Sequence, residues 1–391
     1  MSARLARLAL FAVVASLGCA LAFPSRASAV PIFAERYGFK CTQCHTAVPE
    51  LNSFGEHFRR AGYRLTNVPQ RHVVPIALRL QEVWTKDLLP SQNRRFNALA
   101  VAISSANFGP DDENSYFARY LFGSQGAAGS LYYGFLQHVT PSNGDFERVG
   151  LLPLQTVANA TQRLDTITSQ PAYTYTVGHS LANLATPRLG VNFGKRTDTV
   201  DLEFVAAFDE YHGAAYGAPA PPSDLAQSFS RPELFATANV ALTPSLTVGI
   251  LGLNGKREFT SRATGLSYSD VYYRDGLEGM WTSPSRRFEV TGQQLWGRDD
   301  DSDGFGTPLE SSGGFLTLKY RPTHNTYVGV RYDAAANPFA QRDYDFYAVW
   351  APTIHSRLVL EHTKPIGFGA APQATQAELL FALPFEKDTR P

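Results

Sequence analysis

Residues 233–253 read ELFATANVAL, TPS and LTVGILGL in succession, and this stretch decides the fold. Apolar side chains recur at every second position on both sides of the tripeptide, which is the period of a β-strand with one apolar face. The tripeptide Thr243-Pro244-Ser245 is short enough to join antiparallel neighbours. We therefore predict two strands, 233–242 and 246–253, that form a hairpin.

The same period of two continues from residue 73 to the C-terminal end of the sequence. Counting the pair above, it predicts about sixteen strands. The pattern is weakest between residues 140 and 170. The predicted strands are 74–84, 96–108, 115–122, 130–139, 172–178, 188–194, 199–208, 233–242, 246–253, 271–281, 287–296, 315–321, 326–333, 344–350, 357–363 and 374–385.

The connections between these strands alternate in length. Short turns with Pro-Ser or Pro-Thr occupy 243–245, 283–285, 322–324 and 352–353, and longer loops rich in Gly, Asp, Ala and Ser occupy 209–231, 255–267, 298–313, 334–341 and 364–372. This alternation is typical of outer-membrane barrels, and the aromatic clusters at 132–133, 272–273 and 344–350 fit their interfacial girdles. We predict a mainly β fold, an antiparallel outer-membrane β-barrel over 73–391. A soluble β-sandwich or propeller is the alternative, although no repeat of blade length is present.

The N-terminus predicts export. Arg4 and Arg7 precede an apolar run at 8–23, and Ala27-Ser28-Ala29 provides a cleavage site, so residues 1–29 are a predicted signal peptide. Removal of the predicted signal peptide takes away Arg4, Arg7 and Arg26. The remaining chain has 32 basic and 35 acidic residues, a net charge of −3. This balance gives no indication of nucleic-acid binding.

The residues Cys41-Thr42-Gln43-Cys44-His45 match the Cys-x-x-Cys-His pattern of c-type haem attachment. We expect Cys41 and Cys44 to bind one haem c covalently and His45 to be an axial iron ligand. The alternative is a chance match or a thioredoxin-like cysteine pair. Residues 30–72 would form a short α-helical haem segment, with one helix that begins at Pro49 and ends at Gly62.

The sixth iron ligand has several candidates. Apart from the initiator, Met280 is the single methionine and lies on a predicted strand, which excludes His/Met ligation within the haem segment. His57 follows His45 by twelve residues on the apolar face of the predicted helix and is the leading candidate, with His72 a weaker one. An open or water-filled site, or Met280 from the barrel wall, remains open.

A second metal signal lies in residues 299–310, which satisfy the calcium-loop pattern D-x-D-x-D-G-x5-E. Asp299, Asp301, Asp303 and Glu310 would supply oxygen ligands to Ca²⁺. The flanking segments are predicted strands rather than EF-hand helices, so a solvated acidic loop that attracts cations is the alternative. Motifs of hydrolases, nucleotide-binding proteins and zinc proteases are absent, and the remaining histidines are scattered over strands and turns.

Residues 31–38, the haem motif, residues 49–55 and Gly62-Tyr63 together resemble the fused cytochrome–porins of bacterial outer membranes, whose best known members are iron oxidases. The resemblance implies a monohaem cytochrome c–porin that passes electrons between an extracellular donor or acceptor, such as Fe(II)/Fe(III), and a periplasmic cytochrome or copper protein. The sequence departs from the iron oxidases between His45 and Pro49, where only Thr46-Ala47-Val48 stand.

Three functions follow from these patterns. The first is an electron-transfer barrel in contact with outer-membrane lipid, with the haem segment on the periplasmic side or in the lumen, which as an enzyme would be an Fe(II):cytochrome c oxidoreductase. The second is a porin or ligand channel in which the haem segment is a structural or gating plug. The third is a soluble periplasmic haem protein.

Overall fold

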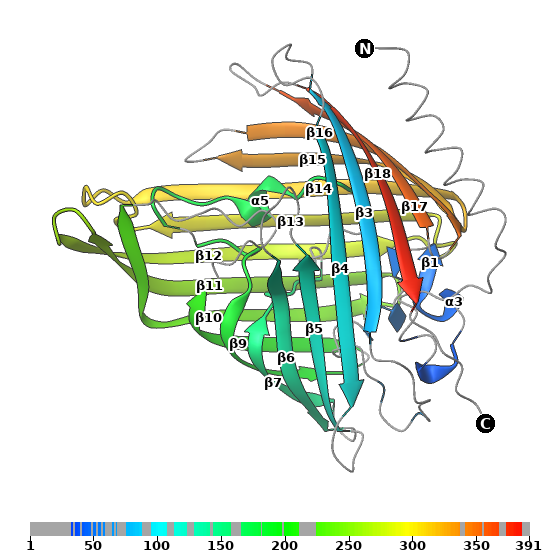
Figure 1. Cartoon of the computed structure of the whole chain (residues 1–391), viewed down its shortest axis with the longest axis horizontal. Helices are drawn as coiled ribbons and strands as arrows, with labels where there is room; N and C mark the ends of the chain where they lie inside the picture. Colours follow the sequence, from blue (N-terminus) through cyan, green and yellow to red (C-terminus); the bar gives the residue numbers. More distant parts are fainter. Residues whose placement is uncertain are drawn as a thin grey trace.

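Sixteen strands, β3 to β18, close into one antiparallel barrel in the computed structural model (Figure 1). The structure describes residues 33, 36–39, 41–47, 50, 51, 54, 55, 58, 65, 68, 76–87, 95–107, 113–122, 129–140, 144–157, 166–180, 182–197, 199–210, 224–336, 341–353, 356–366 and 373–384. The strands are β3 (Ile76–Asp87), β4 (Arg95–Asn107), β5 (Asn114–Phe122), β6 (Ser130–Thr140), β7 (Asp145–Leu152), β8 (Arg188–Arg196), β9 (Val200–Glu210), β10 (Leu225–Thr243), β11 (Leu246–Ser261), β12 (Ser267–Thr282), β13 (Phe288–Asp299), β14 (Leu309–Thr323), β15 (Thr326–Ala336), β16 (Gln341–Thr353), β17 (Ser356–Pro365) and β18 (Ala374–Pro384).

Each strand pairs with the next along the chain, and β18 pairs with β3 to close the barrel. The predicted number of strands is confirmed, but two errors offset each other. The strand β7 falls in the stretch of weakest pattern and was not predicted. The predicted strand 172–178 is wrong, because Pro171 starts the short helix α5 (Pro171–Thr174) and Gly178 has a φ of 55°.

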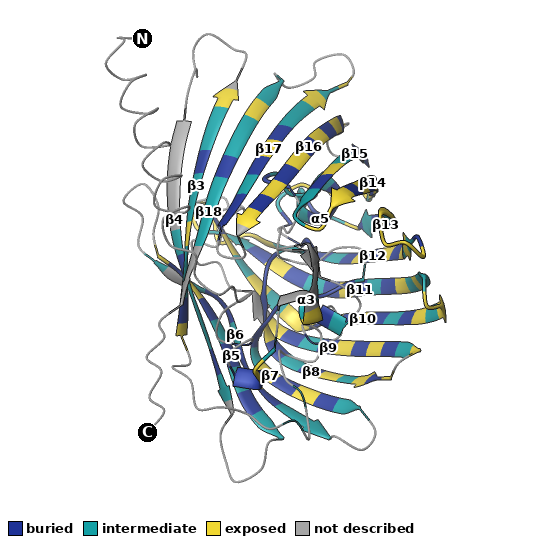
Figure 2. Cartoon of the chain, turned by 90° about the vertical axis from the view of Figure 1, so that its right-hand side faces the viewer, coloured by how far each residue is buried: buried dark blue, intermediate teal, exposed yellow. Residues whose placement is uncertain are grey.

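The two faces of the barrel wall differ in polarity. Large apolar side chains are exposed on the outside, such as Leu136 (52%), Ile250 (57%) and Leu277 (54%), whereas Arg188, Arg257, Arg274 and Arg331 are among the largest fully buried side chains. Figure 2 shows the resulting bands of exposed and buried residues along β8 to β11. An apolar exterior around a polar interior is the arrangement of a transmembrane β-barrel.

The predicted aromatic girdle is confirmed in part. Tyr273, Tyr344, Phe346 and Trp350 are exposed on the apolar exterior. In contrast, the girdle prediction is wrong for four residues whose side chains are buried: Tyr132, Tyr133, Tyr272 and Tyr347.

The two rims of the barrel differ in their connections. At one rim, which we call the short-turn end, β10 and β11 are separated by two residues, and β3 begins and β18 ends here too. The opposite rim, the long-loop end, carries connections such as 211–224 and 300–308. The predicted loop 255–267 is shorter than expected, because β11 and β12 extend to leave only 262–266 between them.

The N-terminal segment contains α3 (Cys41–Cys44), followed by a small hairpin of β1 (His45–Ala47) and β2 (Glu50–Leu51). The predicted helix does not begin at Pro49, because Leu51 pairs with His45 in the hairpin. Phe54, Gly55 and Phe58 are helical, as predicted. Among the described residues, no helix is long and apolar enough to cross a membrane.

Candidate functional site

A segment between β7 and β8 lies inside the barrel and contacts the opposite wall. We call residues 153–187 the crossing segment, of which 153–157, 166–180 and 182–187 are described. Its side chains are largely buried, with Leu154 and Val177 fully so. Its helix α5 packs against β14 and β15. The lumen is therefore narrowed by the chain itself.

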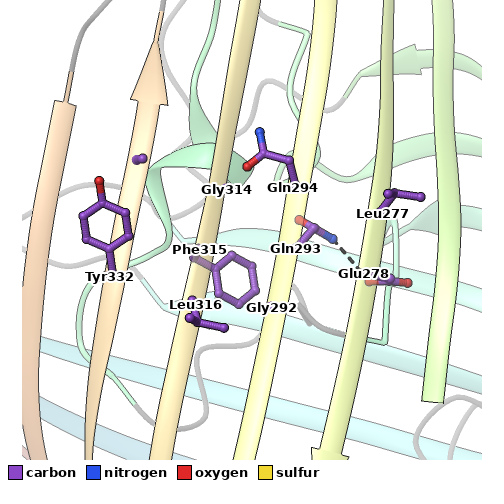
Figure 3. A pocket seen from close by; sticks show the side chains of 10 residues that line it. Leu277, Glu278, Gly292, Gln293, Gln294, Gly314, Phe315, Leu316 and Tyr332 are labelled. Atoms are coloured by element: carbon purple, nitrogen blue, oxygen red, sulfur yellow. Dashed lines mark hydrogen bonds between the residues drawn. The ribbon is translucent and has the colours of Figure 1, made fainter. Parts of the chain in front are cut away.

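The first contact of the crossing segment is with β12 and β13. The backbone amide of Val157 donates a hydrogen bond of 3.0 Å to Glu278, and the Gln293 amide donates to Thr156 Oγ1 at 3.3 Å. Gln293 also donates to Glu278 at 3.3 Å, as the dashed line in Figure 3 shows. A buried carboxylate thus accepts from both the wall and the crossing segment.

The second contact lies on β15 and β17. The Glu361 carboxylate accepts hydrogen bonds from the amides of Ile167 and Thr168 and from the Thr168 hydroxyl. Arg331 donates to Thr166 Oγ1 at 2.7 Å and to Thr168 Oγ1 at 3.0 Å. The charge of Arg331 is balanced by two buried carboxylates, Asp333 and Asp345, each 2.6 Å from the guanidinium.

The third contact surrounds α5. The Tyr173 hydroxyl donates to the carbonyl of Leu154 at 2.5 Å, which joins the described parts 153–157 and 166–180 of the crossing segment. Tyr175 forms a 3.1 Å hydrogen bond with Ser311 of β14, and the Arg274 guanidinium lies 5.4 Å from the centre of its ring. Burial raises the pKa of Tyr175, so the phenol stays protonated at pH values above the ordinary tyrosine pKa.

The fourth contact reaches the long-loop end. The backbone amide of His179 donates to the Ser302 carbonyl at 2.7 Å, and His179 Nδ1 lies 2.7 Å from the Tyr268 hydroxyl. The chain then enters β8, where Arg188 pairs with Glu233 of β10. The crossing segment therefore contacts the wall at β12 to β15 and at β17.

One cavity of about 370 Å³ opens in the wall of β12 to β15. Figure 3 shows Leu277, Leu316 and Tyr332 around it, and Gly292 and Gly314 also line it. Leu277 and Leu316 are exposed on the apolar exterior, so the cavity faces outward.

The N-terminal segment packs against the inner wall through aromatic side chains. Phe58 makes edge contacts with Phe33 and Tyr37, at centroid distances of 5.4 and 5.7 Å. These three rings belong to one buried cluster with wall residues such as Val101 and Phe117. Phe33, Tyr37 and Phe58 of the N-terminal segment therefore lie against the inner wall of the barrel.

The predicted haem ligands are only partly described. The backbone of α3 places Cys41 and Cys44 three residues apart on one turn, and Cys44 is half-buried. His45 begins β1. His57 and His72 lie outside the described residues, as does the predicted signal peptide.

The predicted calcium ligands are not gathered around one point. Asp299 pairs with Arg274 at 2.8 Å. Asp301 and Asp303 accept the amides of Gly306 and Phe305 within their own loop. Among the described residues, no group of three or more His, Cys, Asp or Glu side chains is placed to hold a metal ion. Calcium binding by Asp299, Asp301, Asp303 and Glu310 stays a prediction.

The crossing segment is the part of the site that the sequence patterns did not reveal. A signal was present, since between Pro153 and Pro187 only Arg163 and Asp165 are charged. A connection of this length and low charge is more suited to a protein interior than to water. No sequence pattern singled out His179, whose backbone amide holds the segment at the long-loop end.

The fold is similar to that of several solved outer-membrane channels. The outer membrane channel DcaP of Acinetobacter baumannii matches with a TM-score of 0.53 and 9% identity, over 80% of this chain and 97% of that one. Salmonella typhi OmpF, in complex with daunomycin, matches with a TM-score of 0.55 and 7% identity, over 79% and 97%. An anion-selective porin from Comamonas acidovorans matches with a TM-score of 0.53 and 8% identity, over 80% and 99%.

The class that these features define is the 16-stranded porin-like outer-membrane barrel. At such low identity the likeness concerns the fold alone. No protein-family model matches the sequence, and no curated protein matches it.

Proposed function

We propose that this protein is an outer-membrane channel whose lumen is narrowed by the crossing segment. The observation that carries the proposal is the closed barrel with an apolar exterior and a charged interior, crossed by a segment that Glu278, Glu361 and Arg331 hold in place. A wide barrel encloses water, and the bound segment would set the size of the solutes that pass.

The test is conduction by the purified, folded full chain in planar bilayers. We expect stepwise openings with a conductance below that of an unobstructed 16-stranded barrel, and exclusion of polymers that are larger than the constriction. Bilayers that stay sealed after insertion of heat-modifiable, folded protein would contradict a channel.

A second function, electron transfer through a c-type haem, is favoured by the haem motif. The residues present fit a haem, because α3 places Cys41 and Cys44 on one turn, His45 follows directly, and aromatic rings of the same segment provide an apolar surface. When bound, the haem supplies a one-electron couple. Cys41 and Cys44 would hold it, His45 would ligate the iron, and the barrel would admit an external donor or acceptor, for instance Fe(II)/Fe(III).

The haem proposal has its own test. Full-length protein, produced with a c-type haem maturation system, should show a pyridine haemochrome spectrum and a covalent mass increase, both absent in the Cys41→Ser/Cys44→Ser control. Addition of Fe(II) under anaerobic conditions then asks whether iron is a donor. Lack of covalent haem in the wild type would contradict electron transfer and leave the channel, with a structural or gating plug.

A further inference from the structure

Two arginines of the inner wall, Arg79 and Arg119, lack a carboxylate partner among the described residues. Among the described residues, the Arg79 side chain donates to Gln81 Oε1 alone, at 3.4 Å, and its Nε is buried without a partner. Arg119 is 7% exposed, and its Nε and Nη1 are likewise buried without partners. Buried N–H groups of a cation are costly to leave unsatisfied.

The strand register places the two guanidinium groups on the same patch. Arg79 is opposite Val101 on β4, and Val101 is opposite Leu121 on β5. Arg119 precedes Leu121 by two residues, so its side chain points to the same side. The neighbours Leu80 and Tyr120 are exposed on the exterior, which places Arg79 and Arg119 inside.

The charge of Glu378 acts on Arg79, but this one carboxylate does not balance the several arginines of the patch. Glu378 of β18 accepts from Arg357 and, at 2.5 Å, from Gln81. Arg36 of the N-terminal segment adds a third guanidinium, because it donates to Ser105, which is opposite Phe117, two residues before Arg119.

The contacts that Arg119 does make leave its donors available. Its guanidinium carbon lies 4.8 and 5.9 Å from the ring centres of Tyr132 and Tyr133. Such contacts occupy the face of the guanidinium, whereas its N–H groups point outward from the edge. A carboxylate can accept two of these N–H groups at once.

We propose that Arg79 and Arg119 form a binding site for carboxylate groups on the inner wall at the short-turn end of the barrel. The carboxylates have two possible sources: the propionates of a haem attached to α3, whose aromatic neighbours pack on this same wall, or a free organic acid in the lumen. The haem source rests on the proposed haem function, and the free acid does not.

The experiment compares Arg79→Gln and Arg119→Gln with Arg298→Gln, which removes a half-exposed arginine at the long-loop end. In the haem arm, the midpoint potential is measured by optical titration of the full-length holoprotein. We expect both cluster variants to shift it downward, because a nearby positive charge stabilises the reduced haem, while Arg298→Gln leaves it unchanged. Arg119→Lys keeps the positive charge, so its midpoint potential should lie close to that of the wild type.

In the free-acid arm, succinate is added to channels of the Cys41→Ser/Cys44→Ser protein in planar bilayers. We expect the succinate concentration for half-block to rise at least tenfold in both cluster variants and to stay unchanged in Arg298→Gln. A response in either arm supports the carboxylate site and identifies its source.

Unchanged potential and unchanged block in both cluster variants would overturn the inference. If the wild type carries no haem, the haem function fails separately, and the succinate arm alone decides the inference. Heat-modifiability on gels checks that every variant is a folded barrel.

Discussion

Arg331 of β15 donates a hydrogen bond of 2.7 Å to the hydroxyl of Thr166, a residue 165 positions earlier in the chain. The same guanidinium lies 2.6 Å from Asp333 and 2.6 Å from Asp345. One buried cation therefore pairs with two wall carboxylates and also holds the crossing segment, so barrel stability and lumen geometry depend on the same side chain.

We predict that Arg331→Met destabilises the barrel by about 3–5 kcal/mol, because it leaves Asp333 and Asp345 buried without their cation. The free energy of unfolding is measured by urea titration of the protein in lipid vesicles. The matched control is Arg298→Gln, which breaks a half-exposed pair with Asp300 and should cost about 0–1 kcal/mol. Equal effects of the two variants would contradict the role given to Arg331.

Glu361 should affect conduction more than Arg331 does. Its carboxylate accepts from two amides and one hydroxyl of the crossing segment. In Glu361→Gln the side-chain NH₂ group faces donors, so we expect a loss of about 1–3 kcal/mol and a higher, noisier single-channel conductance. The exposed Glu258 on β11 provides the control variant Glu258→Gln. A conductance identical to the wild type in Glu361→Gln would show that the crossing segment is held without Glu361.

Gly178 is required where the crossing segment meets the β13–β14 loop. Its φ is 55°, and a Cβ at this position would lie 2.7 Å from the carbonyl oxygen of Ser302. Gly265 has a similar φ of 71° with open space around it. We expect Gly265→Ala to cost about 1–2 kcal/mol from backbone strain alone. Gly178→Ala should lower the free energy of unfolding by more than Gly265→Ala does, and it should also raise the single-channel conductance. Urea titration in lipid vesicles and planar-bilayer recording measure the two effects. Equal losses of stability in the two variants would mean that the β13–β14 loop moves away from the added methyl group at no cost in free energy.

The raised pKa of Tyr175 predicts that the stability of the protein depends on pH under alkaline conditions. Its pKa is raised by burial, so between the ordinary tyrosine pKa of about 10 and the raised value the native state keeps a proton that the unfolded state has lost. Stability should then fall as pH rises above about 10. Unfolding titrations of wild type and Tyr175→Phe at pH 8 to 11 test this. The phenylalanine variant should lose about 1 kcal/mol at pH 8, from the Ser311 hydrogen bond, and should show a shallower decline. If the stabilities of the wild type and Tyr175→Phe fell in parallel between pH 8 and 11, the pH dependence would not come from Tyr175.

The fold was predictable because the period of two is a local property. Residues 233–253 already contain one full hairpin, and the structure pairs Phe235 with Leu253 as that hairpin requires. Strand ends were underestimated, since β10 begins at Leu225, eight residues before the apolar alternation starts. In β7 the polar Arg148 is buried and Val149 is exposed, so an expectation of apolar residues inside does not apply.

The lumen could not be predicted in the same way, because its contacts join residues far apart in the chain. Thr168 and Glu361 are separated by 193 positions. Nothing in the local sequence of 166–180 distinguishes a segment buried inside a barrel from a strand in its wall. The haem motif is the opposite case, because five adjacent residues carry the chemistry and no tertiary contact is needed to recognise it.

The sixth haem ligand is the last prediction, and it follows from helical spacing. Phe54 and Phe58 are helical, and their rings are parallel with centroids 6.5 Å apart. His57 lies outside the described residues, so its assignment as a ligand rests on its spacing in the sequence. We expect His57→Ala to convert a low-spin haem spectrum to a high-spin one and His72→Ala to leave it unchanged, as recorded by absorbance of the full-length oxidised protein. The control is His362→Ala on β17, whose ring lies 3.0 Å from Thr375 Oγ1. A high-spin change in His72→Ala instead would move the ligand to His72. A low-spin spectrum in both variants would leave Met280 to be tested, and a high-spin wild type would mean an open or water-filled position.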